Sequence, residues 1–310
     1  MSSAPLAEAE RLLQEAFGER VRRSFPMAPL TTFRIGGPAA LYLEPESDQD
    51  LAAAGRAIAL TGLPFVVVGK GSNVLVSDAG FPGLVLRLGR SYRWAARDRE
   101  RLTAGGSMPL PALAGVALHH GLAGLEFGVA IPATLGGAVK MNAGAHDGSI
   151  SDVLERIEVF RLTQGSVESI TSEDVGFSYR RSTLPHDGVV IGGVLRLHRA
   201  DPVAIREKMD EARDWRRRTQ PLAEPNCGSV FTNPPGDHAA RLIEAAGGKG
   251  RRVGGASVST KHANFILAEP GATAADVAGL IAELQDLVEG EAGVRLVPEV
   301  RFVGEFPGVA

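Results

Sequence analysis

The most suggestive chemistry in this sequence lies in a glycine turn that follows a strongly apolar run. Residues 65–68 are Phe-Val-Val-Val, and Gly69-Lys70-Gly71-Ser72-Asn73 follows them directly. Glycines permit positive φ and let backbone N–H groups approach an anion, so this turn can cradle a diphosphate. An ordinary strand-to-loop turn explains the same residues equally well. The three-glycine dinucleotide-binding pattern fails because Val74 occupies the third glycine position, and the Walker phosphate-loop pattern also fails.

A second candidate ligand surface is the segment 126–145, which is dense in small side chains. It contains Ile131-Pro132-Ala133-Thr134, then the pair Gly136-Gly137 and, after Asn142, Gly144-Ala145. Pro132 can open a helical turn, and the N-terminus of a helix binds phosphate through its free N–H groups. Small side chains equally permit close packing of a helix on a neighbouring element, and this alternative stays open.

Charged and hydroxyl side chains mark three further segments. Arg180 and Arg181 stand next to each other near aromatic residues, which indicates either an anion site or a solvated edge strand. Ser229 follows a glycine at the start of a short apolar run, but the Gly-x-Ser-x-Gly pattern of a hydrolase is absent. Glu299 lies in an apolar C-terminal strand, where its burial requires a partner such as Arg301 on the same strand face. An exposed Glu299 on an edge strand is the alternative.

These segments must be positioned by helices and strands that are mixed along the chain. Helical patterns are predicted at residues 48–61, 108–120, 202–218, 237–246 and 273–288, besides a leading helix within residues 1–23. Strand patterns rich in β-branched residues are predicted at residues 65–68, 84–88, 153–162 and 189–197. Such mixing indicates an α/β or α+β fold. The charged helix at 202–218 predicts a domain boundary near residue 200, which separates residues 1–199 (subdomains 1–88 and 89–199) from residues 200–310.

Composition excludes several classes of protein. The 310 residues carry a net charge of −3, and 44% of them are hydrophobic, which is typical of a soluble globular protein and not of a nucleic-acid binder. The single cysteine, Cys227, excludes an internal disulfide, a multi-cysteine zinc site and an iron–sulfur cluster. No apolar run reaches the length of a membrane span, and the N-terminus lacks an apolar signal core. We therefore expect a cytoplasmic protein without nucleic-acid or membrane partners.

Taken together and in this order, the five segments resemble those of the UDP-N-acetylenolpyruvoylglucosamine reductase family. The resemblance extends from Thr-Thr-Phe-Arg-Ile-Gly-Gly at residues 31–37, through Lys-His-Ala-Asn-Phe-Ile at 261–266, to Pro-Glu-Val-Arg-Phe at 298–302. It implies an α+β fold, in which a two-part FAD-binding unit of the vanillyl-alcohol-oxidase (PCMH) type precedes a C-terminal α+β substrate domain. It also implies NADPH-dependent, FAD-mediated reduction of UDP-N-acetylglucosamine enolpyruvate to UDP-N-acetylmuramate in peptidoglycan synthesis.

The resemblance further implies roles for individual residues. The catalytic residues are Arg180, which faces the substrate carboxylate, Ser229, which donates a proton, and Glu299. The contacts of a noncovalently bound FAD are Gly69, Lys70, Gly71, Ser72, Asn73, Ile131, Pro132, Ala133, Gly136, Gly137, Asn142, Gly144, Ala145 and Arg301. The substrate-binding residues are Arg218, Asn233 and Lys261, and no metal ligand is expected. Because only 49 positions separate Arg180 from Ser229, the chain resembles the subtype that lacks an inserted tyrosine loop.

The sequence departs from the family pattern in places, and two other functions stay open. Ala133 replaces a common glycine after Ile-Pro, so a methyl group must fit at that flavin contact. One alternative is another FAD oxidoreductase on the same scaffold, although no histidine adjoins the glycine turn, which disfavours a covalently attached flavin. The other alternative is a UDP-sugar-binding protein without catalysis. No obligate protein partner is evident from the sequence.

Overall fold

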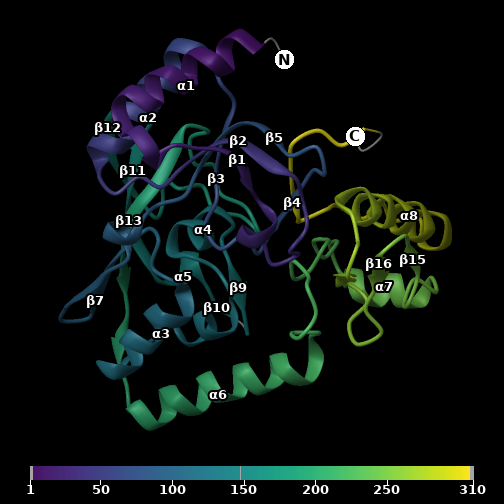
Figure 1. Ribbon diagram of the computed structural model, residues 1–310. Coiled ribbons are helices and arrows are strands. Elements are labelled where there is room, and N and C mark those ends of the chain that lie inside the picture. Colours follow the sequence, from purple (N-terminus) through teal and green to yellow (C-terminus); the bar gives the residue numbers. More distant parts are fainter. Residues whose placement is uncertain (1–2, 147, 308–310) are drawn as a thin grey trace. The chain divides into compact units, whose positions relative to one another are not determined.

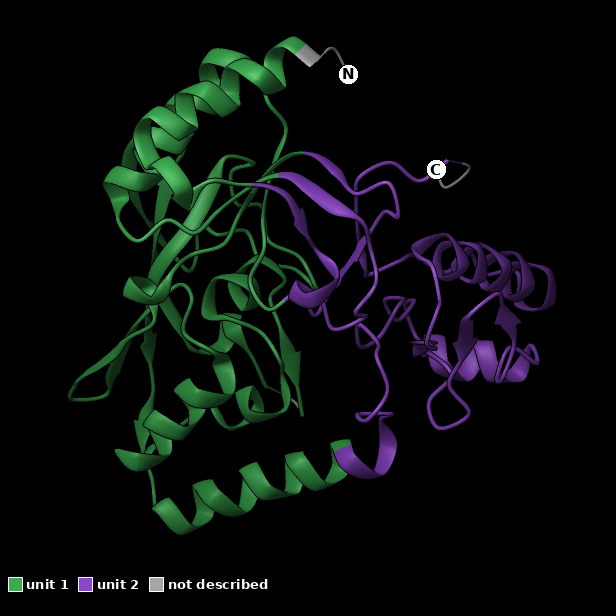
Figure 2. Ribbon diagram, in the orientation of Figure 1, with its two compact units in different colours: residues 1–22, 41–70, 83–216 green, residues 23–40, 71–82, 217–310 purple. Residues whose placement is uncertain are grey.

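Residues 3–146 and 148–307 are described by the computed structural model, and they fall into two units (Figure 2). Unit 1 comprises residues 1–22, 41–70 and 83–216, and unit 2 comprises residues 23–40, 71–82 and 217–310. Unit 2 thus combines two short N-terminal segments with the C-terminal part of the chain. The division into residues 1–199 and 200–310 stays a prediction about domains, because the two units are groups of spatial neighbours and not continuous segments.

Unit 1 is built around a five-stranded antiparallel sheet (Figure 1). Its strand order is β12 (Ser166–Thr171), β11 (Leu154–Arg161), β13 (Gly188–Arg196), β7 (Arg101–Gly105) and β6 (Ala95–Asp98). Successive side chains of a strand point to opposite faces, and β13 buries both of its faces. Val190 belongs to a core that includes α3 (Leu110–His119) and α4 (Leu135–Lys140), whereas Val189 belongs to one that includes α1 (Ser3–Phe17) and α2 (Asp48–Thr61).

Further strands and helices lie before, between and after the strands of this sheet along the chain. β3 (Phe65–Val67) pairs in parallel with β5 (Phe81–Leu86), and the antiparallel pairs are β8 (Leu122–Ala123) with β14 (His198–Arg199) and β9 (Gly144–Ala145) with β10 (Gly148–Ser149). The remaining helices and 3-10 turns are α5 (Ile150–Val153), α6 (Pro202–Thr219), η1 (Gly18–Arg20), η3 (Arg90–Tyr92) and η4 (Glu126–Ala130). β1 (Arg22–Pro26) and β2 (Pro38–Leu43) belong to a sheet with the strand order β1-β2-β5-β3.

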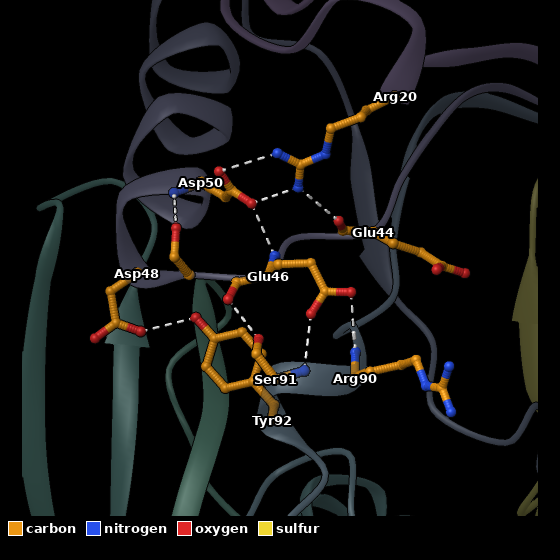
Figure 3. Close-up of polar contacts among 9 residues, drawn as sticks. Arg20, Glu44, Glu46, Asp48, Asp50, Arg90, Ser91 and Tyr92 are labelled. Atoms are coloured by element: carbon orange, nitrogen blue, oxygen red, sulfur yellow. Dashed lines mark hydrogen bonds and ion pairs between the residues drawn. The ribbon is translucent and has the colours of Figure 1, made fainter.

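Polar contacts fix the N-terminus of α2 (Figure 3). The Ser47 side chain caps this helix by accepting a hydrogen bond from the Asp50 N–H (3.2 Å). Glu46 accepts hydrogen bonds from the backbone N–H groups of Arg90 (3.1 Å) and Ser91 (2.8 Å). Burial alone would raise the pKa of Glu46, but hydrogen bonds from these residues outweigh it and lower the pKa below its usual value. The helix predicted at residues 48–61 is confirmed with those bounds.

Unit 2 combines a small antiparallel sheet with two helices. The sheet consists of β15 (Arg252–Val253), β16 (Ala256–Val258) and β17 (Ile266–Ala268), and its core includes side chains of α7 (Ala239–Ala245) and α8 (Ala274–Ala292). Unit 2 also contains η2 (Ala28–Leu30) and the parallel pair of β4 (Val74–Val76) with β18 (Arg301–Val303). The Asp78 carboxylate accepts hydrogen bonds from the backbone N–H groups of Ala274 (2.7 Å) and Ala275 (2.9 Å). Asp78 therefore ties the segment after β4 to the start of α8.

The structure confirms most predicted elements and corrects two local interpretations. The helical patterns at residues 108–120, 202–218, 237–246 and 273–288 correspond to α3, α6, α7 and α8, and the leading helix is α1. Residues 177–182 do not form the edge strand that we considered, because Ser178 and Arg181 form an isolated bridge around a turn in which Arg180 has φ +56°. The C-terminal strand begins only at Arg301, so Glu299 precedes it.

Candidate active site

The glycine turn at residues 69–73 has the properties of an anion cradle. None of its five backbone N–H groups donates a hydrogen bond to the part of the chain that the structure describes. A Cβ atom on Gly69 would lie 2.5 Å from Thr134 Oγ1, and one on Gly71 would lie 2.0 Å from the Leu30 carbonyl oxygen. Gly71 also has φ +62°, which disfavours side chains. Unpaired donors on a backbone that excludes side chains fit the diphosphate of FAD.

The second half of the turn is held in place within unit 2. The Thr32 N–H donates to the Gly71 carbonyl (3.1 Å). The Asn73 side-chain amide donates to the Glu299 carbonyl (3.1 Å), and the Arg301 N–H donates back to the Asn73 carbonyl (3.0 Å). These bonds continue the β4–β18 pairing, and they place Glu299 beside a turn that lies 226 positions earlier in the sequence.

The small-residue segment forms α4, but the N-terminus of this helix is not available to an anion. The N–H groups of Leu135 (2.8 Å) and Gly136 (2.9 Å) donate to main-chain carbonyls of the 106–108 segment. The Gly137 N–H donates to the Thr134 side chain (3.2 Å), which caps the helix. The first three N–H groups of α4 are therefore already bonded within the protein. This agrees with close packing of the helix on a neighbouring segment, the alternative that the sequence left open. The predicted flavin contacts of this segment remain predictions.

Arg180 is held beside the end of the same segment. Asn142, which is buried and has φ +40°, donates from its side chain to the Ser178 carbonyl (3.1 Å) and accepts from the Ser151 N–H (3.1 Å). The bond from Asn142 to the Ser178 carbonyl anchors the turn that carries Arg180. The Arg180 guanidinium carbon lies 5.2 Å from the centre of the Tyr179 ring, so the charge stacks on an aromatic face. Unit 1 thus brings together the predicted catalytic arginine and the predicted flavin segment.

Within unit 2, Glu299 is hydrogen-bonded to Val230, the residue that follows Ser229. The Val230 carbonyl accepts a hydrogen bond from the Glu299 N–H (2.7 Å), and the Val230 N–H donates to the Asn264 carbonyl (2.9 Å). Ser229 itself is half-buried and follows Gly228, which has φ +79°. Asn264 belongs to the motif at residues 261–266 that contributes to the family resemblance, but the motif alone predicts no role for it.

The lone cysteine is not a candidate nucleophile. Cys227 is buried, and burial, followed by the nearby negative charge of Glu299, raises the pKa of its thiol far above the usual value. A thiol that stays protonated is a poor nucleophile. Its side chain belongs to the core of unit 2, while the hydroxyl group of Ser229 lies two residues further along the chain.

The three predicted substrate-binding residues lie in unit 2. The Lys261 ammonium donates to the Arg217 carbonyl (2.5 Å), near the end of α6. Asn233 accepts a hydrogen bond on its side-chain oxygen from the Ala239 N–H (3.0 Å), at the first residue of α7. Arg218 is exposed on α6. Lys261 and Asn233 therefore have structural contacts, and the substrate contacts of all three residues remain predictions.

Comparison with known proteins decides the family. Residues 39–171 match the family model of an FAD binding domain, and residues 220–303 match that of the UDP-N-acetylenolpyruvoylglucosamine reductase C-terminal domain. The reductase of Heliobacterium modesticaldum is 45% identical over 91% of this chain and 90% of its own length. The reductase of Halalkalibacterium halodurans is 41% identical over 97% and 99%. The chain belongs to the UDP-N-acetylenolpyruvoylglucosamine reductase family.

A solved structure of a family member has the same fold. The crystal structure of UDP-N-acetylenolpyruvylglucosamine reductase from Thermus caldophilus superimposes with a TM-score of 0.80 at 38% identity, over 92% of this chain and 99% of that one. The predicted fold class is thereby confirmed: an FAD-binding domain of the PCMH type and a reductase C-terminal domain in a mixed α+β chain. The predicted cofactor, FAD, is confirmed by the FAD-binding domain that the family shares.

Proposed function

We propose that this chain catalyses the NADPH-dependent reduction of UDP-N-acetylglucosamine enolpyruvate to UDP-N-acetylmuramate, a step of peptidoglycan synthesis, with a noncovalently bound FAD. Membership of the reductase family supports the reaction. The observation that carries the residue assignment is the Ser229–Val230 segment bound to Glu299, in the unit that also holds Asn73 of the glycine turn. FAD held by the glycine turn at residues 69–73 would supply the hydride chemistry between NADPH and the terminal carbon of the enolpyruvyl group.

Arg180 is proposed to bind the substrate carboxylate. Addition of hydride to the terminal carbon places negative charge on the adjacent carbon and on its carboxylate. A guanidinium stays charged and can bind a carboxylate through two parallel hydrogen bonds, so it stabilises the charge where it develops. The left-handed conformation of Arg180 (φ +56°) and the Asn142 bond to the Ser178 carbonyl hold the backbone of the turn that carries this side chain.

Ser229 is proposed to complete the reaction by protonating the carbon next to the carboxylate. Its hydroxyl group gives a proton to that carbon and recovers one from solvent, so the product gains one hydride and one proton in total. Glu299 assists when it is protonated or paired with a cation, because a bare carboxylate would repel the developing charge. No tyrosine lies between Arg180 and Ser229 in the sequence, so we further propose that no inserted loop tyrosine takes part in catalysis.

We also propose that the reaction takes place in the cytoplasm. The single cysteine, buried and unable to form an internal disulfide, supports a reducing compartment. No helix among the described residues combines the length and the apolar character that a membrane span requires.

The assignment of Ser229 is tested by separating the two halves of the reaction. A Ser229→Ala variant should lose flavin absorbance on addition of NADPH as fast as the wild type, because that half requires no proton from Ser229. Recovery of the absorbance on addition of the enolpyruvyl substrate should slow by at least about 10²-fold, the lower end of what a positioned acid supplies. Stopped-flow absorbance measures both halves. A Ser257→Ala variant, at a buried serine of β16, is the control. Equal slowing of both halves, or of neither, would remove Ser229 from this role.

A further inference from the structure

A buried asparagine holds the backbone that follows Ser229. Asn264 is only 4% exposed. Its side-chain oxygen accepts a hydrogen bond from the Phe231 N–H (2.9 Å), and its side-chain amide donates to the Phe231 carbonyl (2.8 Å). Its own carbonyl accepts from the Val230 N–H (2.9 Å). The side chain thus satisfies both polar groups of Phe231, as a neighbouring strand does in a sheet.

The hydrogen bonds between the Asn264 side chain and Phe231 act after Ser229, whereas a different side chain acts before it. Gly228 has φ +79° and open space where a side chain would be, and its N–H donates to the Asn226 side-chain oxygen (2.9 Å). Residues 228–231 belong to no regular strand, and Phe231 forms only an isolated bridge with Pro298. The direction of the Ser229 hydroxyl group therefore depends on the fixed positions of Val230 and Phe231.

We infer that Asn264 is the positioning residue for the Ser229 proton donor. The inference rests on the proposed function, since it assigns proton donation to Ser229. The role requires an uncharged side chain that presents one donor and one acceptor at the same time, which only asparagine and glutamine provide in this form. Asn264 touches neither substrate nor cofactor in this assignment, and it acts on the reaction only through the backbone of residues 230–231.

The test replaces Asn264 with aspartate, which has the same size but lacks the amide donor. A carboxylate oxygen then faces the Phe231 carbonyl oxygen. Because both groups are buried acceptors, they repel each other and the hydrogen bond to the Phe231 carbonyl is lost. In the flavin-loaded Asn264→Asp enzyme, bleaching by NADPH should stay near the wild-type rate. Recovery of absorbance with the enolpyruvyl substrate should slow by about 10- to 100-fold, as expected for a catalytic group displaced by about 1 Å. Hydrogen exchange of the Val230 and Phe231 amides, measured without substrate, should become faster.

Two further variants separate positioning from a loss of stability. Gln285→Leu is the matched control, because it removes a side-chain amide bond to the Leu296 carbonyl (2.8 Å) in the same unit and has no bond to residues 228–231. It should leave both half-reactions near wild type. The double variant Ser229→Ala/Asn264→Asp should be no slower than Ser229→Ala alone, because a residue that acts through Ser229 has no effect once the hydroxyl group is gone. If Asn264→Asp does not fold, Asn264→Gln, which moves donor and acceptor by one methylene, replaces it in the same tests.

The outcomes distinguish the inference from the function on which it rests. Normal recovery in Asn264→Asp, beside slow recovery in Ser229→Ala, overturns the inference and leaves the proposed function intact. Equal slowing of both half-reactions, or additive slowing in the double variant, also overturns it, since Asn264 would then act by another route. Normal recovery in Ser229→Ala overturns the assignment of Ser229 itself, and the inference with it.

Discussion

At the scale of single residues, two positions that the sequence assigned to the site have left-handed backbone conformations. Six non-glycine residues of the described chain have positive φ, and Asn142 and Arg180 are two of them. Such conformations cost of order 1–3 kcal/mol and persist where surrounding contacts determine them. Asn142 meets this condition through its two side-chain hydrogen bonds. Strain at both residues is consistent with a turn that must present Arg180 in one direction.

Gly71 provides the sharpest prediction at this scale. Gly71→Val should give a folded protein with little bound flavin, because the new Cβ atom would lie 2.0 Å from the Leu30 carbonyl and would force the turn to move. Gly293→Val is the control, since Gly293 has a similar φ of +66° and nothing within 4 Å of its Cβ position. Gly293→Val should lose about 1–3 kcal/mol of unfolding free energy because of its positive φ, and Gly71→Val should lose more because of the additional clash. The ratio of flavin to protein absorbance measures the difference, and a folded Gly71→Val variant with full flavin content would contradict the cradle.

At the scale of elements, a side-chain carboxylate reinforces the backbone pairing at one end of β11 and β13, where Arg161 is paired with Gly188. Asp187, just before β13, accepts hydrogen bonds from Arg161 Nε at the end of β11 (2.9 Å) and from the Thr163 N–H (3.2 Å). Burial alone would raise the pKa of Asp187, but hydrogen bonds from Thr163 and Arg161 outweigh it, and the pKa falls below its usual value. The charged form of Asp187 therefore stabilises the sheet.

This stabilisation predicts a specific dependence on pH. A carboxyl group with a lowered pKa in the folded state contributes stability above its unfolded pKa of about 3.9, and the contribution is lost as pH falls through the folded pKa. The unfolding free energy of the wild type should therefore decrease more steeply between about pH 5 and pH 2.5 than that of Asp187→Asn. Urea unfolding at constant ionic strength measures both curves. Asp98→Asn, on the exposed strand β6, is the control, and parallel curves for wild type and Asp187→Asn would contradict the role.

At the scale of the whole molecule, the chain passes from one unit to the other within the glycine turn. Unit 1 includes Lys70 and unit 2 begins again at Gly71. The assigned residues are divided in the same way, because Arg180 belongs to unit 1, and Ser229 and Glu299 belong to unit 2. Each unit therefore holds only part of the set of residues proposed to be catalytic.

The cofactor should be a noncovalent, removable part of the whole protein. We expect a yellow protein that releases its flavin into the supernatant on acid precipitation, because no histidine adjoins the glycine turn to attach it. Returning FAD to the flavin-free protein should raise the unfolding temperature, since a ligand at 100 times its dissociation constant adds about 2.7 kcal/mol to the folded state. Absorbance of the supernatant and thermal melts measure both effects. Flavin that remains with the precipitate would contradict noncovalent binding.

Local signals in the sequence determined the elements and the family. The bounds of α2 follow from a serine cap and a terminal glycine, which act over a few residues and are visible in the sequence. The order of a few short motifs was sufficient to predict the reductase family, the PCMH-type FAD-binding fold and the cofactor, and the comparisons confirm all three. These properties depend on residue types and their order, so they need no coordinates.

Only the tertiary structure decided how the motifs contact one another. The bond from Asn73 to the Glu299 carbonyl spans 226 positions, and the bonds between Asn264 and Phe231 span 33, distances over which periodicity and capping carry no information. The sequence could not show that the first N–H groups of α4 are already bonded, or that residues 177–182 turn instead of extending as a strand. Which donor meets which acceptor is settled by packing, because a buried polar group takes whatever partner the fold brings within reach.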